Sequence, residues 1–231
     1  MVKIMLDAGH GGKDSGAVGN GLREKDLTLN IVKKIGNLLA EYEDVEVHYT
    51  RTDDRFLELS ERAAIANKLK ADYFISVHIN AGGGTGFESY IFNNTKDAKT
   101  IAYQNVIHAE IMKGIGNVTD RGKKRANYAV LRETHMPAIL TENLFIDNAN
   151  DAAKLKSEQF LLQVAHGHVI GLEKAFGLKK KAKPQPQPKP QQKVSDKKLY
   201  RVQVGAFTDP DNAKQLAEEL KKKGYPAYIT E

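Results

Sequence analysis

Two histidines and two glutamates of the 231-residue chain stand beside apolar runs, in positions where they could do chemistry. His10 and His78 each follow an apolar run, and Glu24 precedes an apolar helical pattern. Two histidines and a glutamate can hold one Zn²⁺ and leave a position open for water, the ligand set of several hydrolytic zinc sites. Glu142 follows a further apolar run and could supply the proton shuttle that such a site needs. The four residues predict a zinc-dependent hydrolase.

Strands and helices are expected to alternate around these residues. Apolar runs predict strands at 2–7, 45–49, 73–79, 87–92 and 138–144, and helical spacing predicts helices at 26–41, 60–69, 97–112 and 158–176. This order indicates an α/β fold with a largely parallel mixed sheet and helices on both faces. His10, His78 and Glu142 would then meet at the carboxyl edge of the sheet. Glu24 is expected in the loop before the first helix, with Asp26 as its N-cap.

Other motifs have simpler interpretations. The glycines beside His10 do not form a nucleotide-binding loop, because Asp14 stands where the last glycine of that motif would be. His135 is near a proline turn and receives no role. Four more histidines are expected to be structural: His48, His108, His166 and His168.

Composition narrows the function classes. The chain has no cysteine, which excludes disulfides, cysteine zinc sites and thiol nucleophiles. No apolar run is long enough for a transmembrane helix, and the N-terminus lacks the pattern of a signal peptide, so no membrane association is expected. The formal net charge of +6 is concentrated after residue 177. Lysine predominates there without aromatic patterning, so we expect no nucleic-acid partner.

The chain is expected to divide at a Lys-, Pro- and Gln-rich segment, residues 178–198, which cannot form a core and favours an extended linker. Residues 1–177 would form the catalytic domain. Residues 199–231 carry one strand–helix–strand pattern, which predicts a small β-α-β unit. A unit of this size is too small for an independent core, so it could be loosely folded or pair with its copy in a second chain.

Several motifs in residues 2–177 together resemble the zinc-dependent N-acetylmuramoyl-L-alanine amidases of the cell-wall hydrolase type (Amidase_3), and most of all the mother-cell autolysins of sporulating bacilli. The resemblance implies that His10, Glu24 and His78 are the zinc ligands and that Glu142 is the catalytic glutamate. The motifs include Asp7-Ala8-Gly9-His10-Gly11-Gly12, Glu24, Arg51, Glu61-Arg62-Ala63-Ala64, Ser76-Val77-His78-Ile79-Asn80, Gly86-Phe87-Glu88, Arg121-Gly122 and Glu142-Asn143-Leu144-Phe145.

The C-terminal pattern is similar to part of a SPOR repeat, a module that binds peptidoglycan, although it supplies one strand–helix–strand unit where a complete domain has about two. The resemblances imply a peptidoglycan hydrolase that acts at the cell wall, as a host autolysin or a phage endolysin. Without a signal peptide, it would be released by cell lysis, a holin or a non-classical route. No helix between Gly86 and Ala126 is expected to plug the cleft, so no activator should be required.

Two other functions fit parts of the pattern. A zinc peptidase or deacylase would have the same zinc ligands but would hydrolyse a different bond. A wall-binding protein with an inactive site would lack turnover, but all four expected site residues are present.

Overall fold

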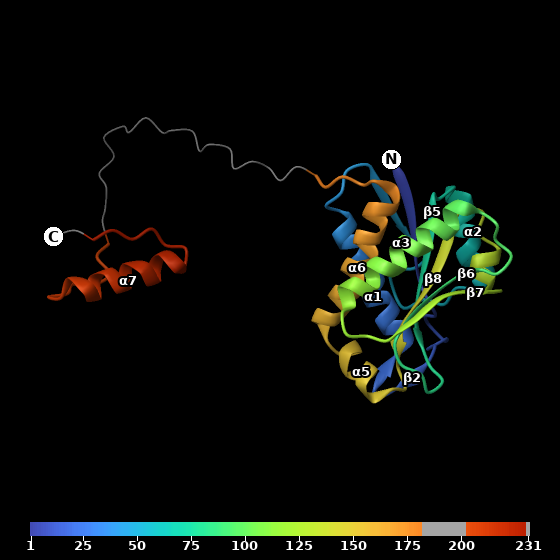
Figure 1. Ribbon diagram of the computed structural model, residues 1–231, viewed down its shortest axis with the longest axis horizontal. Helices are drawn as coiled ribbons and strands as arrows, with labels where there is room; N and C mark the ends of the chain where they lie inside the picture. Colours follow the sequence, from blue (N-terminus) through green and yellow to red (C-terminus); the bar gives the residue numbers. More distant parts are fainter. Residues whose placement is uncertain (182–201, 230–231) are drawn as a thin grey trace. The chain divides into compact units, whose positions relative to one another are not determined.

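The computed structural model of the chain describes residues 1–181 and 202–229 (Figure 1). The chain divides into two compact units, which are described separately. Most of the expected linker, 178–198, lies outside the described residues. Every helix within residues 1–181 and 202–229 is too short or too polar to span a lipid bilayer.

The first unit contains a six-stranded mixed sheet with the strand order β4-β1-β5-β8-β6-β7. The first four of these strands run parallel, β6 is antiparallel to β8, and β7 is parallel to β6. The strands are β1 (Val2–Ala8), β4 (Val45–Tyr49), β5 (Tyr73–Asn80), β6 (Phe87–Phe92), β7 (Asp120–Ala126) and β8 (Ala138–Phe145). A separate two-stranded ribbon consists of β2 (Val18–Gly19) and β3 (Leu22–Arg23).

Helices cover both faces of this sheet (Figure 1). Ile4 and Leu6 of β1 face a core built with α1, α3 and α6, whereas Met5 faces a smaller core built with α2 and α4. This alternation follows from the two-residue period of a strand. The expected α/β class is therefore confirmed. The helices are α1 (Glu24–Leu39), α2 (Leu59–Leu69), α3 (Ala98–Ile115), α4 (Ala129–Arg132), α5 (Ala149–Leu155) and α6 (Glu158–Phe176).

The first helix begins earlier than its apolar pattern indicates. Glu24, expected in a loop, is the first residue of α1, and Asp26 lies in the first turn rather than at the N-cap. The N-cap is Arg23, whose side chain makes no capping hydrogen bond. Sequence pattern alone placed the boundary too late because the residues that fix this helix end are distant in sequence.

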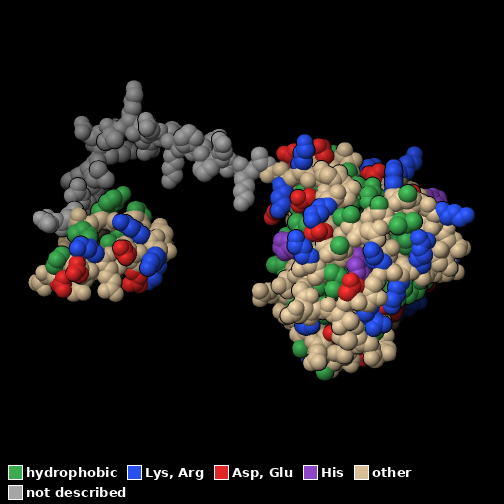
Figure 2. Space-filling view, viewed as in Figure 1, with side chains coloured by type: hydrophobic (Ala, Val, Ile, Leu, Met, Phe, Trp, Pro, Cys, Tyr) green, Lys and Arg blue, Asp and Glu red, His purple; other side chains and the backbone are tan. Residues whose placement is uncertain are grey.

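The C-terminal unit contains the expected helix, α7 (Pro210–Lys222), which begins after the N-cap Asp209. The flanking segments form no strand among residues 202–229, although both were expected as strands. A strand needs a hydrogen-bonding partner, and one strand–helix–strand unit offers few. Figure 2 shows hydrophobic side chains on the surface of this unit. Its exposed large apolar residues are Val202, Val204, Phe207, Tyr225, Tyr228 and Ile229.

Candidate metal centre

His10 lies in a turn after β1, and two buried arginines donate hydrogen bonds to the backbone of this turn. β1 ends at Ala8, and His10 follows with a φ of 61°, in the left-handed region that costs a non-glycine residue about 1–3 kcal/mol. Arg62 Nη2 donates to the carbonyl of His10 at 2.7 Å, and Arg51 Nη2 donates to the carbonyl of Gly9 at 2.8 Å. Both guanidinium groups also bond the carbonyl of Ala8. These contacts fix the strained turn.

Glu24 lies between the two candidate histidine ligands and is only 4% exposed. Its Oε2 lies 3.1 Å from Nε2 of His10, and its Oε1 lies 3.0 Å from Nδ1 of His78. The backbone N–H groups of Ala17 and Ile79 each donate to this carboxylate at 2.9 Å. The start of α1 thus fixes a carboxylate between two imidazoles.

These three side chains suit a divalent metal ion. One nitrogen from each histidine and one oxygen of Glu24 all lie within 4.8 Å of one another. Burial would raise the pKa of Glu24, but hydrogen bonds with His10 and His78 hold it far below its usual range. An ionised carboxylate with two imidazoles is a nitrogen and oxygen donor set that fits Zn²⁺. The structure therefore brings together the residues that the sequence named as ligands.

Glu142 lies next to this group. It is in β8 and pairs directly with His78 of β5 in the register of the sheet. Its Oε2 is buried and has no hydrogen-bond partner among the described residues. Burial raises the pKa of Glu142 to about 7. A pocket of about 330 Å³ is lined by His10 and His78. An unpartnered carboxylate oxygen with this raised pKa can accept and release a proton near neutral pH.

Asp14 orients His10, a role that no sequence motif indicates. Asp14 Oδ2 lies 2.8 Å from Nδ1 of His10, and Oδ1 accepts a hydrogen bond from the backbone of Gly16 at 2.9 Å. A carboxylate on the second nitrogen of a ligating imidazole fixes its tautomer and ring orientation. The only signal in the sequence is an aspartate four residues after the histidine.

Asp14→Asn is expected to weaken zinc affinity by about 10- to 100-fold, the usual effect of losing such a partner. The asparagine oxygen can still accept from Gly16, and its NH₂ group then faces His10 and cannot accept from Nδ1–H. Chelator competition measures the affinity. An unchanged zinc dissociation constant would show that Asp14 does not support the ligand.

Other histidines have structural partners. His168 is fully buried, pairs with Thr141, and has a pKa lowered by burial to about 4. His108 lies 2.9 Å from both Ser89 Oγ and Asp120 Oδ1, an arrangement similar to a Ser–His–Asp triad. Ser89 is fully buried, so it cannot meet a polymeric substrate. We interpret this chain of contacts as a link between α3 and the sheet.

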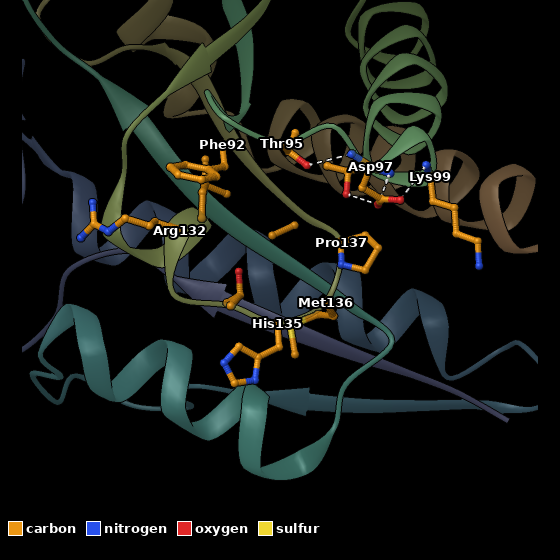
Figure 3. A pocket seen from close by; sticks show the side chains of 12 residues that line it. Phe92, Thr95, Asp97, Lys99, Arg132, His135, Met136 and Pro137 are labelled. Atoms are coloured by element: carbon orange, nitrogen blue, oxygen red, sulfur yellow. Dashed lines mark hydrogen bonds between the residues drawn. The ribbon is translucent and has the colours of Figure 1, made fainter.

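His135 lies far from the candidate ligands. It lines a pocket of about 370 Å³ together with Pro137 and Asp97, beside the N-terminal end of β8 (Figure 3). The candidate metal centre is near the carboxyl ends of the parallel strands β1 and β5. His135 and this pocket are therefore at the opposite edge of the sheet.

An α/β sheet with a His–Glu–His group and an adjacent glutamate whose Oε2 is buried is consistent with a metal-dependent hydrolase. Comparison with known proteins defines the class. The N-acetylmuramoyl-L-alanine amidase family matches residues 4–174, and the chain belongs to this family of peptidoglycan hydrolases.

Individual relatives agree with this family. A sporulation-specific N-acetylmuramoyl-L-alanine amidase of Bacillus subtilis is 47% identical over 99% of this chain and 84% of its own length. The endolysin of Bacillus phage SPP1 is 52% identical over 78% of this chain and 68% of its own length. Among solved structures, the catalytic domain of the amidase CwlV from Bacillus (Paenibacillus) polymyxa matches with a TM-score of 0.73 and 38% identity, covering 78% of this chain and all of that domain.

The SPOR domain family matches residues 156–231, which overlaps the amidase match. The structure assigns the overlap largely to α6, which packs against α1 and α3 in the first unit. SPOR and amidase matches together support peptidoglycan as the substrate and the cell wall as the place of action. They give no support for dimerisation through the C-terminal unit, which remains a prediction.

Proposed function

We propose that the chain hydrolyses the amide between N-acetylmuramic acid and L-alanine with a Zn²⁺ held by His10, Glu24 and His78. The observation that carries this proposal is the His–Glu–His donor group beside the unpartnered Oε2 of Glu142. Zn²⁺ bound there would polarise the scissile carbonyl and lower the pKa of a water molecule toward about 7.

Glu142 is the proposed general base and general acid. Its Oε2 takes a proton from the attacking water and afterwards delivers it to the nitrogen of the departing L-alanine. Glu24 cannot share this role, because both of its oxygens accept hydrogen bonds from backbone N–H groups and face the histidines. Asp14 and the two arginines hold His10 in place during turnover.

Mass analysis of digested peptidoglycan tests the bond and the metal together. We expect free stem peptides that begin with L-alanine, lost with a chelator and restored by zinc. Release of single amino acids or acetate would instead indicate a peptidase or deacylase at the same site. Absence of any product, with and without zinc, would favour a wall-binding protein without turnover.

A further inference from the structure

A cluster of charged side chains lies beside Glu142, on the opposite side from His78. Glu88 of β6 pairs directly with Glu142 of β8 in the antiparallel register, so their Cα atoms are about 4.5–5.5 Å apart. Glu88 is 2% exposed and accepts hydrogen bonds from two cations of β7, Arg121 and Lys124. The cluster therefore borders the reacting centre.

An irregularity in β7 brings the two cations to one carboxylate. Residues three apart in a regular strand point to opposite faces of the sheet. The register of β6 and β7 shifts here, so that Arg121 and Gly122 stand opposite Glu88 alone, and Gly122 has a φ of 85°. Such bulges re-aim side chains and are frequent beside active sites. The bulge lets both Arg121 and Lys124 reach Glu88.

Glu88 is held as an anion by several donors. Asn80 Nδ2 and Tyr90 OH each donate to Oε1 at 2.7 Å, while Arg121 Nε donates to Oε2 at 2.7 Å. Burial would raise the pKa of Glu88, but hydrogen bonds from Lys124, Tyr90 and Arg121 lower it to about 2. One carboxylate thus faces two cations, and the cluster carries a net positive charge at neutral pH.

The positive charge is accessible to a ligand. The side chain of Arg121 is 33% exposed and that of Lys124 is 36% exposed. Arg121 uses only its Nε toward Glu88, and its two terminal NH₂ groups donate to no acceptor within the described residues. The Cζ atom of the guanidinium also lies 4.8 Å from the centre of the Phe145 ring, in a cation–π contact. A free guanidinium fork of this kind matches a carboxylate.

We propose that Arg121 and Lys124 bind a free carboxylate of the stem peptide next to the scissile amide. This inference rests on the proposed function, which places that amide between the metal centre and Glu142. In the stem peptide, the residue after L-alanine is a glutamate joined through its side chain, whose α-carboxylate is either free or amidated. The cluster therefore selects the free acid over the amide, and Arg121 determines this specificity.

Two soluble substrates test the proposal: N-acetylmuramoyl-L-alanyl-D-isoglutamate and the corresponding isoglutamine, each with its side-chain carboxyl capped as an amide, as it is in the stem peptide. We expect zinc-loaded wild-type protein to prefer the acid in kcat/KM by about 10- to 100-fold, the usual effect of a charge-assisted hydrogen bond. Arg121→Gln should reduce this ratio toward one, and Arg121→Lys should keep part of it. Arg125→Gln is the matched control, because Arg125 is also in β7 but bonds the backbone of Thr95; its ratio should equal that of the wild type.

Equal cleavage of the two substrates by wild-type protein would overturn the proposal. So would an unchanged ratio in Arg121→Gln, since a purely structural role would affect both substrates alike. Binding of both compounds to zinc-loaded Glu142→Gln protein gives the same comparison without turnover. If binding prefers the acid but wild-type protein cleaves neither compound nor peptidoglycan, the proposed function fails and the carboxylate site stands. Equal affinities of the Glu142→Gln protein for the two compounds would contradict the carboxylate site but not the proposed function.

Discussion

Glu142→Gln is expected to lower turnover by about 10²- to 10⁴-fold, the scale of a lost general base, while zinc remains bound. Glutamine cannot accept the water proton at the position of Oε2. The metal ligands His10, Glu24 and His78 are unchanged, so metal analysis should give the same zinc content as in wild-type protein. Wild-type turnover in this variant would remove Glu142 from the mechanism.

The same substitution is expected to stabilise the metal-free protein at alkaline pH. The pKa of Glu142 is raised by burial from 4.5 to about 7, so ionising this group destabilises the folded state. The cost is absent below pH 4.5, grows as the pH rises toward 7, and is complete above 7. A difference of this size corresponds to about 3 kcal/mol, because one pKa unit is about 1.4 kcal/mol.

Denaturant unfolding of chelated protein at pH 4.5 and pH 8 measures this effect. The stability gain of Glu142→Gln should appear at pH 8 and vanish at pH 4.5. Glu133→Gln is the matched control, because Glu133 is a surface residue paired with Arg132 and its loss should change stability by less than about 0.5 kcal/mol. Equal stability of the Glu142 variant and wild type at pH 8 would contradict the assigned pKa.

The sequence allowed prediction of how distant residues converge at the site. His78 and Glu142 each lie within an apolar run, and buried parallel strands bring such positions to one end of a sheet. The strand order itself did not need to be known.

Contacts that depend on chain segments far apart were not predictable. Arg51 and Arg62 reach the turn before His10 from a loop and from α2, and no local pattern shows that their donors meet the carbonyls of that turn. The same holds for the start of α1 at Glu24, whose carboxylate is fixed partly by the distant backbone of Ile79. Tertiary hydrogen bonds decide these details.

β7 was missed for a different reason. Its residues, Asp120 to Ala126, are almost all polar or charged and show no apolar alternation. As the edge strand of the sheet it buries little surface, and charges on an edge discourage pairing with other chains. Apolar alternation cannot reveal such a strand, although two of its cations bind Glu88, the neighbour of Glu142 in the sheet.

Replacing His10 is expected to remove zinc binding and to lower activity by more than about 100-fold. Loss of a residue that only supports a metal ligand, such as Asp14, costs at most about 100-fold. Asparagine is the preferred replacement, because it tolerates the left-handed backbone of His10 better than alanine does. His10→Asn thus separates the loss of a ligand nitrogen from added backbone strain. His135→Asn is the matched control at the opposite edge of the sheet.

Thermal unfolding with and without zinc measures the change directly. A ligand that binds only the folded state stabilises it by about 4 kcal/mol at a concentration 1,000 times its dissociation constant. Wild-type and His135→Asn proteins should show this zinc-dependent rise in Tm, and His10→Asn should lose most of it. Since Glu24 and His78 remain in place in His10→Asn, full zinc occupancy there would mean that these two residues bind the metal with another partner, and the assignment of His10 as a ligand would be wrong.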